Sequence, residues 1–311
     1  MSQPPKPGRH TGIPFAEYQQ WDAINSSFLW TLKTRSPLHA KWRREHPRED
    51  TPALLFGRAL HSYVLEPTTW DETWAVCPPC DRRTKAGKAT YAEFEATLGG
   101  REPLKADQYE AIVAMANAVR AQQCRHLISG GTSEVSLVWE DPETGLLCKG
   151  RLDYERDSGW DHFICDVKTT EDASEWGFAA SIARFGYYQA AAFYCDGWQA
   201  LKGTPSEFVW LAVEKSPPYV TKVWQCDEQT MAAGRNSYRQ ALRTAAECLK
   251  TGLWPAFGEN SEMIDAPEWL LRREGVGPYN MRPEHQPAGG PSYAPGEEPE
   301  HDEIDDFLKG D

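Results

Sequence analysis

Two aspartates and a lysine in the middle of the chain have residue types and a spacing that could support metal or acid–base chemistry. Asp153 lies near the end of one short apolar segment, and Asp166 and Lys168 lie on the next, in "GRLDYERDSGWDHFICDVKTT". Side chains alternate along a strand, so Asp166 and Lys168 share one face. If the two strands pair antiparallel across the turn at 155–161, both carboxylates converge at one edge of a sheet. Converging carboxylates repel each other, which is typical of a cation site or a coupled acid–base pair.

Two acids and a lysine on one face suit the hydrolysis of a phosphodiester. A hard divalent cation takes carboxylate and carbonyl oxygens, and the carbonyl of Val167 is available at the same edge. The cation would polarise the phosphate and lower the pKa of a bound water, while Lys168 could position that water or stabilise charge developing on the phosphate. An Asp-x-Lys pair is also common as a plain salt bridge at the end of a strand, so these residues alone leave both interpretations open.

The elements that must position these residues follow from the hydrophobic periodicity. Before the aspartates, the pattern predicts helices over 15–41 with a break near 25–27 and a restart at Ser36-Pro37, a helix over 54–65, a strand in 70–79, a basic loop that enters a helix over 81–98, and a helix over 105–127. The centre is a three-strand meander over 134–140, 146–154 and 162–169, with a hairpin turn at 141–145. After it come a helix over 175–196, strands over 208–214 and 219–226, and a long helix over 227–252.

This order of elements predicts an α/β fold in which helices flank a central mixed β-sheet, with a helical N-terminal part. Residues 1–14 and the acidic, Pro- and Gly-rich tail at 276–311 are expected to be disordered, which leaves 15–275 as a single domain. Apolar runs of about 18 residues and an N-terminal signal peptide are both missing, so we expect a cytoplasmic protein without a membrane span.

Charge and cysteine content narrow the class of partner. The net charge is −13, and the segment from Met281 onward, with nine acids and two bases, holds −7 of it. An acidic body can still bind DNA through a local basic lining, and a metal site needs acids of its own. Among eight cysteines, Cys77 and Cys80 form a CxxC pair. A second pair at zinc-finger spacing is missing, which favours a turn over a metal site.

The motif and its flanking segments resemble the PD-(D/E)xK nuclease superfamily, with "GRLDYE" as the first acidic strand and "CDVKTT" as the acid-x-lysine strand. More narrowly, roughly residues 15–270 are similar to phage recombination exonucleases of the exodeoxyribonuclease VIII (lambda-exonuclease-like) type. "SSFLWTLKTRSPLHA" resembles that family's N-terminal helix, "LLFGRALHSYVLEP" its histidine-bearing helix, and "YRQALRTAAECLKTGLWPAF" its last helix and Trp-Pro turn.

The resemblance implies a restriction-endonuclease-like core and an exonuclease that depends on Mg²⁺, with Mn²⁺ as a substitute. Such an enzyme degrades the 5′-ended strand of double-stranded DNA and leaves 3′ single strands for recombination by annealing. Lys168 would be the catalytic lysine, acting with the two aspartates. The implied metal ligands are Asp153, Asp166, the Val167 carbonyl, His61 from the N-terminal helix and, as a weaker candidate, Glu134. Taken alone, a helical histidine such as His61 is more often an ordinary core or surface residue than a ligand, and Glu134 is equally a solvated acid at a strand edge.

Basic and polar residues lie where a DNA path would need them. The candidate DNA contacts are Arg82, Arg83, Lys85, Lys149, Arg151, Gln189 and Tyr194. Alternation places Lys149 and Arg151 on the face of Asp153, whereas the cluster at 82–88 is equally a solvated helix start. The family usually spaces its glutamine and tyrosine four residues apart. Gln189 and Tyr194 are five apart, which rotates them off a common helix face.

The resemblance also implies partners and leaves alternatives. The implied partners are ends of double-stranded DNA, a single-strand annealing recombinase and further copies of the chain in a ring, in a bacterial host cytoplasm if the chain is phage-encoded. The alternatives are a structure-specific or single-strand nuclease of the same superfamily, and a catalytically inactive DNA-end-binding protein. The C-terminal "DEIDDFLKGD" resembles the acidic, aromatic tips by which bacterial single-strand DNA-binding proteins recruit partners, although acidic tails are usually only solubilising.

Overall fold

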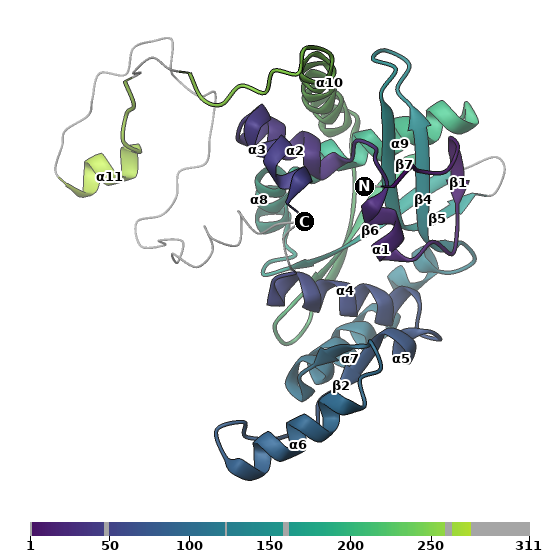
Figure 1. The fold of residues 1–311 in the computed structure, drawn as a ribbon, viewed down its shortest axis with the longest axis vertical. Coiled ribbons are helices and arrows are strands. Elements are labelled where there is room, and N and C mark those ends of the chain that lie inside the picture. Colours follow the sequence, from purple (N-terminus) through teal and green to yellow (C-terminus); the bar gives the residue numbers. More distant parts are fainter. Residues whose placement is uncertain (1, 47–49, 122, 158–161, 259–262, 275–311) are drawn as a thin grey trace.

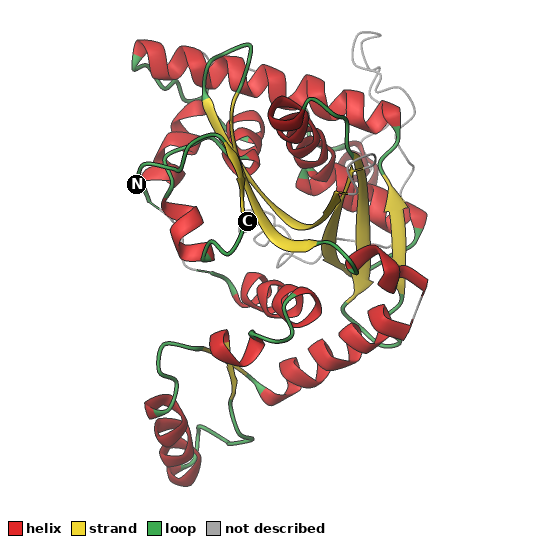
Figure 2. Ribbon diagram, turned by 90° about the vertical axis from the view of Figure 1, so that its right-hand side faces the viewer, coloured by secondary structure: helices red, strands yellow, loops and turns green. Residues whose placement is uncertain are grey.

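The architecture is a six-stranded mixed sheet with helices on both sides (Figures 1 and 2). The computed structural model describes residues 2–46, 50–121, 123–157, 162–258 and 263–274, so the expectations for 276–311 lie outside the described residues. In sheet order the strands are β1 (Gly8–His10), β4 (Thr132–Glu140), β5 (Leu147–Asp157), β6 (His162–Thr170), β7 (Glu207–Glu214) and β8 (Thr221–Gln225). Strands β6 and β7 run parallel, and the other neighbouring pairs run antiparallel. The predicted α/β class with a central mixed sheet is confirmed.

The remaining elements follow the predicted order. They are α1 (Phe15–Gln20), α2 (Ser26–Thr34), α3 (Pro37–Glu45), α4 (Pro52–Leu65), α5 (Trp70–Thr73), β2 (Trp74–Val76), α6 (Lys85–Ala96), β3 (Glu102–Leu104), α7 (Ala106–Ala121), a 3₁₀ helix (Gln123–Ile128), α8 (Glu175–Phe185), α9 (Tyr187–Lys202), α10 (Glu228–Thr251) and α11 (Glu268–Arg273). Side-chain caps fix several helix starts: Asn25, Ser36, Thr51 and Asp227 each accept a backbone N–H from the first turn. Over the described ranges, none of these helices has the length and apolar character needed to cross a membrane.

Two hydrophobic cores cover the two faces of the sheet. Alternate residues of β7 divide between them: Phe208 and Trp210 pack with α2, α9 and α10, whereas Val209 and Leu211 pack with α4 and α7. Strand β6 divides in the same way, with Val167 on the α4 side. The sheet is therefore buried on both faces, and a polar side chain on β5 or β6 must lie between the helix layers.

Three local predictions need correction. Residues 1–14 are not wholly disordered, because Gly8–His10 pairs with β4 at the edge of the sheet. The predicted single helix over 175–196 is two helices, since Gly186 takes a left-handed conformation (φ +70°) between α8 and α9. The segment at 70–79 begins as the short helix α5 before it becomes β2.

The chain between α4 and α7 forms a projection at the end of the molecule away from α10 (Figure 1). It carries α6 and the two-stranded sheet β2–β3. Arg82, Arg83 and Lys85 lie there, exposed, with Arg82 stacked over the ring of Tyr91 and Arg83 paired with Asp81. Their predicted DNA contacts would therefore be made at a distance from the aspartates.

Candidate metal centre

Three side chains that can ligate a metal lie together where β5 separates from β6. His61 comes from α4, Glu134 from β4 and Asp153 from β5, and one donor atom of each lies within 4.8 Å of the others. His61 Nδ1 lies 3.5 Å from Asp153 Oδ2. Separate elements, distant in sequence, thus bring an imidazole and two carboxylates to one point.

The two predicted aspartates meet in the gap between their strands. Strands β5 and β6 are antiparallel as expected, but their pairing ends at Tyr154–Cys165, one position before Asp153 and Asp166 would face each other. Asp153 Oδ2 instead accepts the backbone N–H of Val167 at 2.8 Å, and the carboxyl of Asp153 lies close enough to that of Asp166 for each to influence the pKa of the other. The ring of His61 also hydrogen-bonds to the backbone of Val167.

Lys168 completes the group on the other side of the strand. Its Nζ lies 2.9 Å from Asp166 Oδ2 and 5.2 Å from the centroid of the Tyr187 ring. Asp166 therefore links the lysine to Asp153, and through Asp153 to His61 and Glu134. The predicted lysine and all the predicted metal ligands lie at one place, while their roles in binding and catalysis stay predictions.

Burial sets the electrostatics of this group. It raises the pKa of both Asp153 and Asp166 to about 6, although the positive charge of Lys168 acts in the opposite direction. Burial also lowers the pKa of His61, and Lys168 lowers it further. The imidazole is thus neutral, the form that ligates a metal, and the carboxyls gain most from a neighbouring cation. Oxygen ligands with one imidazole fit a divalent cation such as Mg²⁺ or Mn²⁺.

Glu134 is held at the site by an unusual backbone. Its φ is +52°, in the left-handed region that residues other than glycine seldom adopt. The pairing of β4 with β5 is interrupted at Glu134 and Asp153, which would face each other between Ser133–Tyr154 and Val135–Leu152. Arg151 Nε donates to Glu134 Oε2. Strain of this kind persists where surrounding contacts over-determine a position, often at functional sites.

A match to known protein families decides the broader assignment. Residues 26–267 match the model of a family described as a PDDEXK-like domain of unknown function (DUF3799). The chain belongs to this family. The predicted PD-(D/E)xK superfamily is thereby confirmed, whereas the narrower exodeoxyribonuclease VIII-like assignment stays a prediction.

A solved structure supports the fold of this PDDEXK-like protein. The crystal structure of a protein from Eubacterium rectale, named "Putative exonuclease", matches with a TM-score of 0.56 and 11% identity, over 85% of this chain and 98% of that one. A structure of SSO0001 matches with a TM-score of 0.27 and 14% identity, over 66% of this chain and 96% of that one. This similarity is too low to indicate a shared fold. The curated proteins give no match.

Three of the predicted DNA contacts of the PDDEXK-like domain are engaged inside the protein. Lys149 is only 3% exposed, and its Nζ donates to the carbonyls of Tyr18, Gln19 and Trp21 at the end of α1. Arg151 donates to Glu134, to the carbonyl of Ile13 and to Ser136. Gln189 is fully buried, where it donates to the carbonyl of Ser26 and accepts from Ser237.

The predicted direct DNA contacts of Lys149 and Gln189 do not fit this burial, for two reasons, whereas Arg151 is partly exposed and its contact stays a prediction. Strand alternation does place Arg151 beside the metal ligands. However, the N-terminal segment covers this face of β5, and its backbone carbonyls accept hydrogen bonds from Lys149 and Arg151. Gln189 faces inward because its side chain connects α9 to the start of α2, through Ser26, and to the middle of α10, through Ser237. The sequence contains no local sign that another segment covers a strand face.

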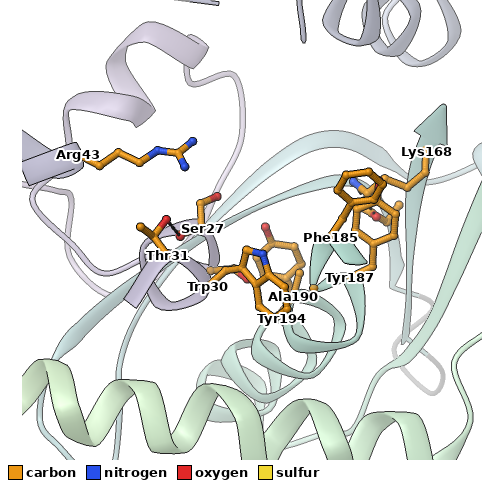
Figure 3. Close-up of a pocket in the computed structure, with 12 residues that line it drawn as sticks. Ser27, Trp30, Thr31, Arg43, Lys168, Phe185, Tyr187, Ala190 and Tyr194 are labelled. Carbon is orange, nitrogen blue, oxygen red and sulfur yellow. Dashed lines mark hydrogen bonds and ion pairs between the residues drawn. The ribbon is translucent and has the colours of Figure 1, made fainter. Parts of the chain in front are cut away.

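Tyr194 keeps its predicted place next to the site. It lines a pocket that contains Asp166 and Lys168 and that lies between α2, α3 and the start of α9 (Figure 3). Sequence reasoning missed the other aromatic residues of this pocket, among them Trp30 and Tyr187. Trp30 lies in "SSFLW" and Tyr187 in "ARFGYY". These two segments are far apart in the sequence, so no local pattern indicates that their aromatic side chains meet.

Proposed function

We propose that this chain is a metal-dependent nuclease and, more narrowly, an exodeoxyribonuclease that degrades the 5′-ended strand of double-stranded DNA. The observation that carries the proposal is the convergence of His61, Glu134 and Asp153 on one point, with Asp166 next to Asp153 and Lys168 at 2.9 Å from Asp166. A structural salt bridge would need only the last pair. The two further acids and the neutral imidazole go beyond such a bridge, and together they fit a divalent cation.

The chain's own residues divide the work of phosphodiester hydrolysis. A divalent cation, for which we propose Mg²⁺, would supply Lewis-acid polarisation of the phosphate and acidify a water molecule. The buried carboxylates hold the cation, and the burial that raises their pKa also keeps the local dielectric low, which strengthens each charge interaction. Lys168 carries its ammonium group on the pocket side of Asp166, where it can orient the attacking water or stabilise negative charge on the phosphate.

The choice of an exonuclease rests on a structural neighbour and on the family resemblance. The protein from Eubacterium rectale that shares the fold is named as an exonuclease, and its match spans nearly all of its length. By resemblance we further propose that the product is a 3′ single strand, that an annealing recombinase takes it up, and that the chain assembles into a homo-oligomeric ring on the duplex end. The tail at 297–311 would recruit a partner through its acids and apolar side chains.

Labelled linear duplexes test the proposal. Wild-type protein with Mg²⁺ should shorten a strand labelled internally from its 5′ end and leave the 3′-ended strand intact, while Lys168→Ala and Asp166→Asn should not. Blunt ends, 5′ overhangs and single strands in parallel separate the exonuclease from a structure-specific or single-strand nuclease. Equal inactivity of wild type and variants on every substrate, with DNA ends still bound, would favour the inactive end-binding protein instead.

A further inference from the structure

A pocket lined by aromatic rings adjoins the metal centre and shares two of its residues. Trp30 from α2, Phe185 at the end of α8, and Tyr187 and Tyr194 from α9 line it together with Asp166 and Lys168. In Figure 3 the rings lie between Arg43 on one side and Lys168 on the other. All four aromatic residues are only partly buried.

The position of the Trp30 ring depends on the backbone at Gly186. Gly186 separates α8 from α9 in a left-handed conformation, and a Cβ atom there would lie 2.6 Å from the indole ring of Trp30. The edge-on ring of Tyr188, with its centroid at 6.0 Å, supports the indole from another side. Gln189 ties the carbonyl of Ser26 to α9. The start of α2 is therefore fixed relative to α9, and the pocket between them is preorganised.

The chemistry of the lining points to a nucleobase. Aromatic faces stack on any of the four bases, because every base has a π-face. An apolar ligand would not need the charges of Arg43 and Lys168 beside it, whereas a nucleotide brings a phosphate with its base. Asp166 and Lys168 belong to both the pocket and the metal centre. A base bound in the pocket would therefore belong to a nucleotide that adjoins the phosphate at the cation site.

We propose that this pocket receives the base of the nucleotide next to the scissile phosphate. The inference rests on the proposed nuclease function and adds a binding site for one base.

Cleavage of a substrate that lacks this base tests the site. In single-turnover reactions with Mg²⁺, the nucleotide next to the cleaved bond is either normal or an abasic tetrahydrofuran analogue. Wild type should cleave the normal substrate about tenfold faster or more, which is the scale of one base–aromatic stack. Trp30→Ala should reduce this ratio to nearly one and Trp30→Phe should restore most of it, while Trp176→Ala, at an exposed tryptophan of α8, should leave it unchanged. An unchanged ratio in both Trp30→Ala and Tyr187→Ala overturns the inference.

A binding measurement separates failure of this site from failure of the proposed function. A short single strand with 2-aminopurine at the same position is titrated with protein in Ca²⁺, and stacking should quench its fluorescence in wild type but not in Trp30→Ala. If wild type quenches the probe but cleaves no DNA, the nuclease proposal fails and the base site stands. If wild type cleaves DNA without quenching the probe and without preference for the normal base, the base site fails alone.

Discussion

The two buried carboxyls make a quantitative prediction about stability. Burial raises the pKa of Asp153 and Asp166 from 3.8 to about 6. A carboxyl whose pKa is higher in the folded state stabilises the fold below its unfolded pKa, and this contribution is lost as pH rises through 6. At about 1.4 kcal/mol per pKa unit, one such carboxyl lowers the free energy of unfolding, relative to acidic pH where both states are protonated, by about 1 kcal/mol at pH 4.5 and about 3 kcal/mol at pH 7.5.

Asp166→Asn removes this cost while keeping the shape of the side chain. Without a divalent cation, we expect the free energy of unfolding of the variant, relative to wild type, to rise by about 2 kcal/mol between pH 4.5 and pH 7.5. Asp153→Asn should behave in the same direction, since its remaining oxygen can still accept the Val167 N–H. Because the two carboxyls are coupled, the double variant should gain less than the sum of the single variants.

Urea denaturation followed by tryptophan fluorescence, in EDTA at both pH values, measures these differences. Glu110→Gln, at an exposed acid of α7, is the matched control and should show almost no change with pH. Addition of Mn²⁺ at pH 7.5 should then stabilise wild type and not the Asn variants, because only wild type gains by neutralising two buried charges. A pH difference for Asp166→Asn as small as that of the control would refute the view that burial of uncompensated charge dominates this site.

Three further outcomes follow from the same geometry. Lys168→Ala should slow single-turnover DNA cleavage by about 100-fold or more yet keep the Mn²⁺-dependent rise in melting temperature, so cleavage at the wild-type rate would contradict its catalytic role. The apparent affinity for Mn²⁺, measured by calorimetry, should fall at least about tenfold per pH unit below pH 6, since the cation must displace protons from the carboxyls; a constant affinity from pH 5 to 7 would contradict this. Gly203→Ala, with φ +74° and open space around it, should cost about 1 kcal/mol of stability by urea denaturation. Gly186→Ala should cost clearly more, because its Cβ also meets Trp30, and equal costs would show that the indole is not fixed there.

The parts of the site that the sequence predicts are those that depend on neighbouring residues. Asp166 and Lys168 share a face because strand alternation is local, and the antiparallel pairing of β5 and β6 follows from a short polar turn between two apolar runs. Helix starts at Asn25, Ser36 and Asp227 are also local, since each cap acts on its own first turn. Strand β1 has only three residues and no apolar alternation, so its pairing with β4 leaves no pattern in the sequence.

The parts that the sequence could not predict depend on which segment covers which. Lys149 lies on the expected side of β5, yet α1 ends over it and its ammonium satisfies three carbonyls there. Gln189 was expected to face DNA, and it bridges three helices instead. His61 could be identified only through family resemblance, because a single histidine on a helix has many uses and its partner Asp153 is 92 positions later in the chain.

The departures from regular structure coincide at one point, and this coincidence itself argues for a ligand. Glu134 adopts a left-handed backbone, the β5–β6 pairing stops at Asp153, and both aspartates are buried with a raised pKa. Each feature lowers the stability of the fold, and a sequence selected for stability alone would replace the acids by apolar residues. Since natural chains break such local rules mainly at functional sites, the arrangement is best explained by a cation that binds the carboxylates and offsets the cost of burying their charge.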